Sequence, residues 1–314
     1  MVEEDEAVTD ISVIIPTYNR LWSLPQAVES CRCAGAKVEI VVVDDGSTDG
    51  TWDWLQSQRD VVAIRTDNWG KDWAVETALR QASGEFIRFL DSDDWLRLDT
   101  NTRQLALARG TAADLVVAGY EDFDHDSGEY RVNAWEDCDD FIAQQLGEGW
   151  SSHYSAFLFR RGLIEGIPHR QDFALRDDRL FVLEAAMRKP RLAIDREPAF
   201  VHRRHSAERL QRTAGFKRYL GYWTHISIYR KILGSLDQRG ELTLRRKRAA
   251  LRMLWPSVRT FARGYPDEAA EVFEWITRLY PEFIPPERRT VSFGYKTLGF
   301  AMTERLLALR VWKR

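Results

Sequence analysis

Two clusters of aspartates in the first hundred residues have the composition of a cation site. Asp44-Asp45 follows the apolar run Val41–Val43, and Asp91–Asp94 follows the run Phe86–Leu90. Carboxylates this close together repel one another. A hard cation such as Mg²⁺ or Mn²⁺ removes that repulsion, because it takes oxygen ligands and usually shares them with phosphates. One such cluster alone is more typical of a solvated turn. Two clusters, each at a strand end, favour a site for a divalent cation and a diphosphate.

A third acidic pair lies at the expected start of a helix. Asp177-Asp178 precedes the run Leu180–Met187, whose apolar spacing is helical. The dipole of a helix favours carboxylates in its first turn without any chemistry. A carboxylate in this place is also suited to take a proton from a substrate hydroxyl. The pattern alone leaves both interpretations open.

These side chains need strands that end beside them, and the sequence predicts such strands. Short, mostly β-branched runs alternate with helical patterns, which is typical of an α/β fold with an open, mainly parallel sheet flanked by helices. In such a sheet, ligands bind beyond the carboxyl ends of the strands, where both aspartate clusters fall. The expected strands are 11–16, 38–43, 61–65, 85–90 and 114–118, and the expected helices are 23–34, 50–58, 71–83 and 99–109.

Three motifs carry a resemblance to a known family. Ser12–Arg20 is SVIIPTYNR, Val43–Asp49 is VDDGSTD, and Phe89–Asp94 is FLDSDD. In wording, order and spacing they resemble the signatures of the family 2 glycosyltransferases, which have the Rossmann-like GT-A fold. The resemblance covers residues 10–205. It implies an inverting, metal-dependent enzyme that moves a hexosyl or N-acetylhexosaminyl group from a nucleotide sugar, by default a UDP-sugar, to a saccharide or lipid-linked acceptor, with Mn²⁺ or Mg²⁺ as cofactor.

The same resemblance implies roles for individual residues. Asp178 is the expected catalytic base with Asp177 as its neighbour, because the family places an acidic pair at a helix start. The loop Val201–Ser206 is similar to the family's late His-containing motif. There, Arg203 or Arg204 is suited to pair with phosphate. The expected metal ligands are Asp93, Asp94 and His205, and the expected nucleotide-binding residues are Pro16, Thr17, Tyr18, Arg20, Asp44, Asp45, Lys71, Asp91, Ser92 and Asp93.

One segment departs from the family pattern. Members often have Asn-x-Gly followed by Ala-Arg-Asn, and this chain keeps Asn68-Trp69-Gly70 but has Ala74-Val75-Glu76. The usual arginine for the diphosphate is therefore missing, and Lys71 is the expected substitute. The gap also supports a rival hypothesis: a nucleotide-sugar-binding protein that has lost catalysis. A nucleotidyltransferase is disfavoured, because the loop Ile15–Arg20 has no glycine to hold a triphosphate.

Charge is distributed unevenly between the front and the back of the chain. The 314 residues carry a net charge of −3, but 16 Lys/Arg and only 3 Asp/Glu lie between Arg203 and Arg263. No nucleic-acid motif accompanies this basic region, so a nucleic-acid partner is not expected. We expect a catalytic domain over residues 1–205 and a basic, helical subdomain over 206–314.

The last residues, 297–314, alternate leucine and aromatic residues with arginine and lysine. This pattern fits an amphipathic helix on an anionic membrane, and equally one packed on its own domain or on a second copy in a homodimer. The acidic N-terminus and the lack of a long apolar run predict a cytoplasmic protein, at most peripheral to the membrane. Three cysteines without a second pair or a nearby histidine predict neither disulfides nor zinc.

Overall fold

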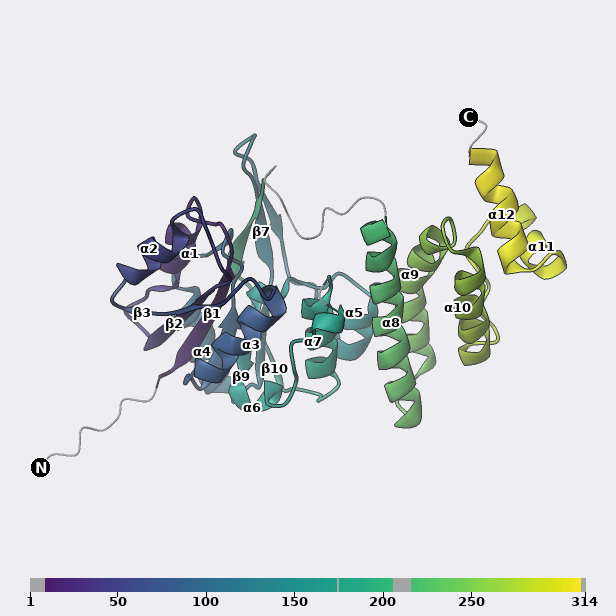
Figure 1. The fold of residues 1–314 in the computed structure, drawn as a ribbon. Helices are drawn as coiled ribbons and strands as arrows, with labels where there is room; N and C mark the ends of the chain where they lie inside the picture. Colours follow the sequence, from purple (N-terminus) through teal and green to yellow (C-terminus); the bar gives the residue numbers. More distant parts are fainter. Residues whose placement is uncertain (1–8, 174, 206–215, 312–314) are drawn as a thin grey trace, which may run out of the picture. The chain divides into compact units, whose positions relative to one another are not determined.

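The central sheet is built from the β-branched runs of the first half of the chain. The computed structural model describes residues 9–173, 175–205 and 216–311 (Figure 1). Seven strands form the sheet in the order β10-β6-β9-β4-β1-β2-β3, and only β9 is antiparallel to its neighbours, β4 and β6. The strands are β1 (Ile11–Thr17), β2 (Val38–Asp44), β3 (Val61–Arg65), β4 (Phe86–Phe89), β6 (Leu115–Ala118), β9 (Leu158–Arg160) and β10 (Leu192–Asp195).

Helices flank this sheet and close its core. α3 packs on β1 and β2, whereas α4 packs on β6 and β10. The elements expected from the sequence are confirmed in type and order, and α1 ends a little earlier than expected because Arg32 is already extended. The helices of this part are α1 (Leu24–Cys31), α2 (Thr51–Gln56), α3 (Lys71–Gln81), α4 (Thr100–Thr111), α6 (Arg161–Ile164) and α7 (Asp177–Ala186).

A second, smaller sheet was not anticipated by the sequence patterns. Its order is β5-β11-β7-β8, and β7 and β8 form an antiparallel hairpin within a segment expected to be irregular. β11 pairs with both β5 and β7. It therefore brings the residues around Arg203 to the acidic segment that precedes β5. The strands are β5 (Trp95–Leu96), β7 (Tyr120–Asp124), β8 (Tyr130–Asn133) and β11 (Phe200–Arg204).

The described residues form two compact units. One takes in the described parts of residues 1–141 and 150–207, and the other takes in those of 142–149 and 208–314. The second unit is helical and includes most of α5 (Phe141–Leu146), which comes from the middle of the first unit's sequence. Among the described residues, no helix is both long and apolar enough to cross a bilayer. The other helices of the second unit are α8 (Phe216–Gln238), α9 (Leu244–Phe261), α10 (Pro266–Leu279), α11 (Arg289–Thr297) and α12 (Phe300–Val311).

Candidate active site

The carboxyl ends of three neighbouring strands define the candidate site. β1 lies between β4 and β2 and is parallel to both, so all three end at the same edge of the sheet. The segment Asp91–Asp94 leaves β4 at this edge, Asp44-Asp45 ends β2, and Thr17 ends β1. The two aspartate clusters predicted to share one edge therefore do so.

The acidic cluster after β4 has the spacing of a cation site. Oxygen atoms of Asp91, Asp93 and Asp94 all lie within 4.8 Å of one another. Asp94 is buried, and its burial together with the charges of Asp93 and Asp91 raises its pKa well above the usual range. Burial also opposes the ionisation of Asp91, but the ammonium group of Lys71 outweighs it and lowers the pKa of Asp91. Three oxygen donors with mutual repulsion are the donor set that a hard divalent cation stabilises.

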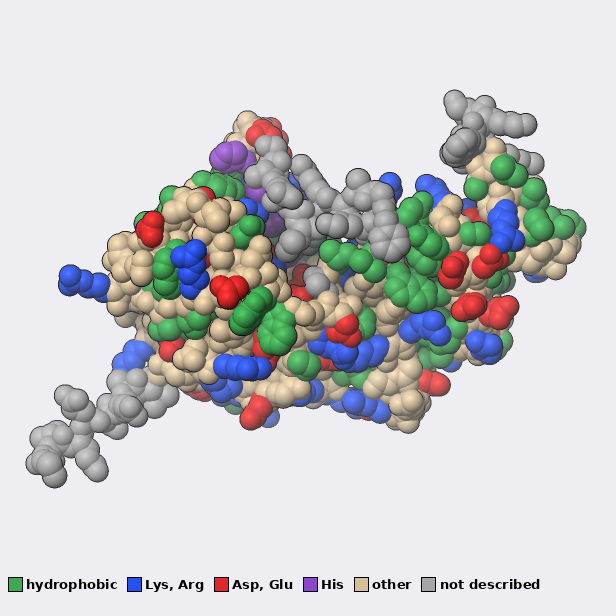
Figure 2. Space-filling model, viewed as in Figure 1, with side chains coloured by type: hydrophobic (Ala, Val, Ile, Leu, Met, Phe, Trp, Pro, Cys, Tyr) green, Lys and Arg blue, Asp and Glu red, His purple; other side chains and the backbone are tan. Residues whose placement is uncertain are grey.

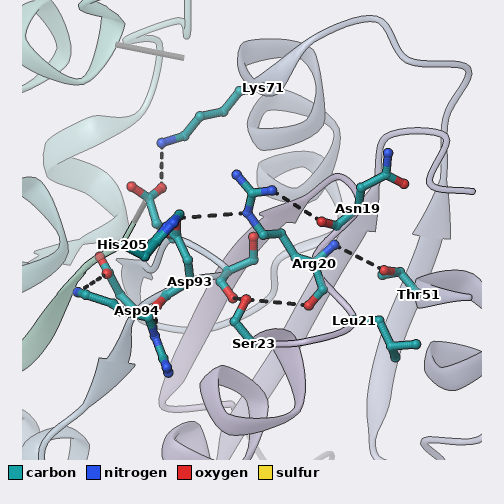
Figure 3. Close-up of polar contacts among 12 residues, drawn as sticks. Asn19, Arg20, Leu21, Ser23, Thr51, Lys71, Asp93, Asp94 and His205 are labelled. Carbon is teal, nitrogen blue, oxygen red and sulfur yellow. Dashed lines mark hydrogen bonds and ion pairs between the residues drawn. The ribbon is translucent and has the colours of Figure 1, made fainter. Parts of the chain in front are cut away.

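Two cations reach this cluster from other elements (Figure 3). The Nζ of Lys71, at the start of α3, lies 2.5 Å from Oδ1 of Asp91. Burial opposes the charged form of Lys71, but the carboxylates of Asp91 and Asp178 prevail and raise its pKa. The Nε of Arg20 lies 3.9 Å from Oδ2 of Asp93. Both cations therefore stand where an anionic ligand of the cluster would be held.

The late His-containing loop meets the acidic cluster from β11. Nε2 of His205 lies 2.9 Å from Oδ2 of Asp93. The backbone N–H of Arg203 donates to Oδ1 of Asp94 at 2.8 Å, and its Nε donates to the carbonyl of Asp93 at 2.9 Å. The Arg203 guanidinium also lies over the rings of Trp22 and Trp95, at 5.4 and 4.6 Å from their centroids. Arg203 thus holds the acidic loop in place.

The opposite end of the site contains two buried polar atoms that lack a hydrogen-bond partner within the described residues. They are Oγ1 of Thr17 and Oδ2 of Asp44, which lie on paired residues of β1 and β2. Oδ2 of Asp44 has a longer ionic contact, 3.8 Å from Nε of Arg65, but accepts no hydrogen bond from the described residues. The other oxygen of Asp44 accepts from the N–H of Ser47 at 3.0 Å. Leaving a buried polar atom unpaired is costly. The pair is therefore suited to bind a polar ligand that supplies the missing hydrogen bonds.

Asp45, in contrast, is fully engaged by the loop before α3. Its Oδ1 accepts from the hydroxyl of Thr66 and the N–H of Trp69, and its Oδ2 accepts from the N–H of Gly70 at 2.7 Å. Gly70 has φ 104°, a conformation that favours glycine, and it is the N-cap of α3. Asp45 therefore sets the position of Lys71.

The remaining residues predicted around the nucleotide differ in exposure. Pro16 is buried within β1, whereas the side chain of Tyr18 is 43% exposed at the rim. Ser92 is buried, and its carbonyl accepts from the hydroxyl of Ser23 at 2.8 Å. Tyr18 thus has a ring free to contact a ligand, whereas Pro16 and Ser92 shape the backbone.

The acidic pair Asp177-Asp178 occupies the first turn of α7, as the sequence predicted. Asp177 is buried: its Oδ2 is bound to Nδ1 of His169, and its Oδ1 accepts from the N–H of Arg170 at 2.6 Å. Asp178 is half-buried, and its Oδ1 accepts from the N–H of Arg179 at 2.8 Å. The two carboxylates therefore differ: Asp177 is held in place by hydrogen bonds, whereas the charge of Asp178 acts on Lys71.

His169 is a site residue that the sequence did not reveal. Its ring stacks on Phe181 of α7 at 4.5 Å, with 18° between the planes, and lies 5.4 Å from the ring of Phe89, the last residue of β4. The hydroxyl of Tyr154 lies 3.3 Å from its Nε2. His169 thus joins the helix that carries Asp178 to the strand that leads into Asp91. Only the carboxylate eight residues later could have suggested this role.

Two further titratable residues, His153 and Asp72, interact with the acidic groups of the site. Burial and the neighbouring His202 lower the pKa of His153 to about 4, and its ring interacts electrostatically with both Asp178 and Asp91. Burial and the carboxylate of Asp177 raise the pKa of Asp72 to about 7. At neutral pH His153 is therefore an uncharged imidazole that interacts with Asp178 and Asp91, and Asp72 is an easily protonated carboxyl that interacts with Asp177.

The raised pKa of Asp72 predicts a pH-dependent stability. Between pH values of about 4 and 7 the folded protein holds a proton on Asp72 that the unfolded chain releases, so the free energy of unfolding should fall as pH rises through this range. Asp72→Asn should have its smallest effect on stability below about pH 4, and its stabilising effect should be at least about 1 kcal/mol larger at about pH 8 than at about pH 5. Urea denaturation at both pH values, in the presence of a chelator, measures this difference. The same gain at both pH values would contradict it, and the exposed Asp126→Asn is the control.

The segment that carries both aspartate clusters is similar to a known protein family. A family model described as glycosyl transferase family 2 matches residues 12–167. A putative glycosyltransferase of Bacillus subtilis (strain 168), EpsH, is 28% identical over 226 residues, which are 64% of this chain and 63% of EpsH. The chain spans less than two thirds of the length of curated relatives such as this one.

Solved structures show the same fold. Residues 1–349 of Staphylococcus aureus TarS, solved with UDP-GlcNAc, align with a TM-score of 0.58 and 17% identity over 95% of this chain and 91% of that chain. A mannosyltransferase of Pyrobaculum calidifontis, PcManGT, solved with GDP-Man and Mn²⁺, aligns with a TM-score of 0.51 and 19% identity over 96% of this chain and 87% of that chain. The fold is the GT-A fold.

Proposed function

Because the chain belongs to glycosyl transferase family 2 through residues 12–167, we propose that it is an inverting glycosyltransferase. It moves a sugar from a nucleotide donor, by default a UDP-sugar, to the hydroxyl of a saccharide or lipid-linked acceptor. The observation that carries the proposal is that one lysine, Lys71, interacts both with the acidic cluster after β4 and with the acidic pair at the start of α7. Lys71 is bound to Asp91 of the donor-side cluster and is influenced by the charge of Asp178 at the start of α7.

In this proposal the nucleotide binds at the carboxyl ends of β1 and β2. Thr17 and Asp44 offer buried atoms that accept or donate no hydrogen bond among the described residues, which suits the polar groups of a base or ribose. The exposed ring of Tyr18 is suited to lie against the base. Arg20 and Lys71 carry positive charge toward the diphosphate, where a charge-assisted contact is strong. Lys71 takes the place of the arginine that Ala74–Glu76 lacks.

Asp91, Asp93 and Asp94 fit a bound Mn²⁺ or Mg²⁺, with His205 beside them. Their oxygens lie within 4.8 Å of one another, and the raised pKa of Asp94 reflects repulsion that a cation would relieve. The fold is shared with PcManGT, which was solved with Mn²⁺. A divalent cation in this place supplies Lewis-acid stabilisation of the negative charge on the diphosphate. Arg203 keeps the cluster in shape through its bonds to Asp93 and Asp94.

Asp178 acts as the general base. It accepts the proton of the acceptor hydroxyl while that oxygen forms a bond to the anomeric carbon, and the bond from this carbon to the diphosphate oxygen breaks on the opposite face. The electron pair leaves with the nucleoside diphosphate, and the configuration at the anomeric carbon inverts. Asp177 contributes by position, because both of its oxygens are already bound.

Binding and turnover test the proposal separately. Calorimetry with a panel of UDP- and GDP-sugars, with and without Mn²⁺, should give a metal-enhanced affinity for one donor. Slow hydrolysis of that donor should then release the nucleoside diphosphate without any acceptor. Metal-enhanced binding with no turnover on any acceptor tried would favour the rival function, a binding protein that has lost catalysis. We also propose that the protein is cytoplasmic and contacts either a membrane or a second copy of itself.

His169 should affect the rate rather than donor affinity. His169→Phe keeps a ring on Phe181 but removes the bond to Asp177, so α7 is expected to lose its exact placement and turnover should fall about tenfold to a hundredfold. His169→Asn retains a donor for Asp177 and should recover most of the rate. Donor affinity by calorimetry should stay within about twofold in both variants. A parallel loss of donor affinity and thermal stability would instead assign His169 to folding alone.

A further inference from the structure

The hairpin of α11 and α12 has an apolar face that the helical unit leaves uncovered. The side chains of Leu298, Met302, Leu306 and Leu309 are 55, 48, 46 and 65% exposed. The spacing of four and three residues places Met302, Leu306 and Leu309 along one side of α12, and Leu298 lies just before this helix. Phe293 of α11 is also exposed. In Figure 2, hydrophobic side chains gather over these two helices. We call Leu298, Met302, Leu306 and Leu309 the outer stripe.

The outer stripe is not the face that attaches α12 to its own unit. The attached face holds Phe300 and Glu304, both buried. The ring of Phe300 stacks on those of Phe273 and Tyr295 at 4.9 and 5.0 Å. Glu304 lies 2.9 Å from Nε of Arg259 and accepts from the hydroxyl of Tyr295. α12 therefore already has a packed and charge-balanced inner face, and the outer stripe is a second apolar face on the same helix.

The charge around the outer stripe is positive. From Arg288 to Arg314 the chain carries seven Lys/Arg and one acidic residue, Glu304, which points inward. Arg288, Arg289 and Lys296 are exposed on the hairpin. Arg305 is also exposed, and it pairs with Asp267 of α10. The segment that carries the outer stripe therefore has a net positive charge.

We propose that the outer stripe and its cations dock on the surface of an anionic lipid bilayer. Apolar side chains on a helix with a cationic border are the chemistry that enters the interface of such a bilayer. A second copy of the chain fits less well. In a symmetric dimer the same surface would face itself, so the Lys/Arg border would lie opposite itself and repel. The proposal is independent of the sugar-transfer reaction.

Co-sedimentation of the full chain with lipid vesicles tests this surface. The wild type should bind vesicles of phosphatidylglycerol and phosphatidylcholine in equal parts, and should bind pure phosphatidylcholine at least about tenfold more weakly. The double variant Leu306→Ser/Leu309→Ser should lose about tenfold in affinity for the mixed vesicles. Arg289→Glu/Lys296→Glu should weaken binding similarly and reduce its dependence on salt. Leu98→Ser, at an 85% exposed residue of the first unit, is the matched control and should bind like the wild type.

Two results would overturn the proposal. One is a wild type that does not bind the mixed vesicles, or binds both vesicle types equally and without salt dependence. The other is a dimer in light scattering that the Leu306→Ser/Leu309→Ser variant dissociates, which would assign the outer stripe to a second copy. All substituted residues are exposed, so unchanged thermal melting should confirm that the variants fold.

Discussion

Asp178→Asn is expected to lower the rate of sugar transfer about a thousandfold while donor affinity stays within about twofold. Asn keeps the size of the side chain and an oxygen that can accept from the N–H of Arg179, so α7 should start unchanged. The substitution removes the ability to take a proton, together with the negative charge that acts on Lys71. The rate is measured by release of nucleoside diphosphate in the presence of acceptor, and donor affinity is measured by calorimetry.

A neighbouring carboxylate provides the control for this experiment. Asp172 lies in the loop before α7, pairs with Arg170 and has a side chain that is 57% exposed. Asp172→Asn removes the same charge from the same region but should leave the rate close to that of the wild type. If Asp178→Asn also kept most of the rate, the base would have to be another group. Asp72 and His153 would then be the next candidates, because both can take up a proton and both interact with the acidic groups of the site.

Asp94→Asn should have opposite effects with and without metal. Without metal, the substitution removes one of three mutually repelling carboxylates, so the thermal midpoint should rise at pH values above the raised pKa of Asp94. Asn still offers an oxygen to the N–H of Arg203. With Mn²⁺, the wild type should gain stability by binding, whereas the variant should lose most of that gain and about a hundredfold in metal-dependent donor affinity.

Thermal melting with a chelator and with Mn²⁺ measures both effects. Asp60→Asn is the matched control, because Asp60 is an exposed carboxylate paired with Arg32 far from the acidic cluster along the sequence. It should respond to Mn²⁺ like the wild type. An Mn²⁺ response of equal size in Asp94→Asn would show that the cation binds elsewhere.

The parallel sheet was predictable from the sequence because its strands are marked locally. Runs such as Val38–Val43 are apolar on both faces, and each ends at a turn rich in Asp or Gly. The placement of Asp44 and Asp91 at one edge follows from this pattern by the geometry of parallel sheets alone. Asp177-Asp178 was found because a helix start with an apolar run behind it is also a local signal.

The second sheet and the support of the base were hidden because their partners are distant along the chain. β7 has no clean alternation, and it pairs with β11 about eighty residues later, as in the pair Val201 and Glu121. β5 has two residues, too few for any periodicity. His169 and Asp72 look like ordinary surface residues until tertiary packing buries them. Their buried contacts exist only in the folded chain.

The path of residues 142–149 has a consequence for how the protein is made. The hydroxyl of Tyr229 donates to the carbonyl of Leu146, and Glu148 pairs with Arg245, so this short stretch is completed by helices that are synthesised much later. While the ribosome is still adding α8 and α9, residues 142–149 lack the helices that complete their unit. Truncation after residue 205 would remove these helices permanently. Expression of residues 208–314 alone would leave a matching vacancy beside Tyr229. No single cut of the chain leaves both units whole, because residues 142–149 of the second unit lie within the sequence of the first.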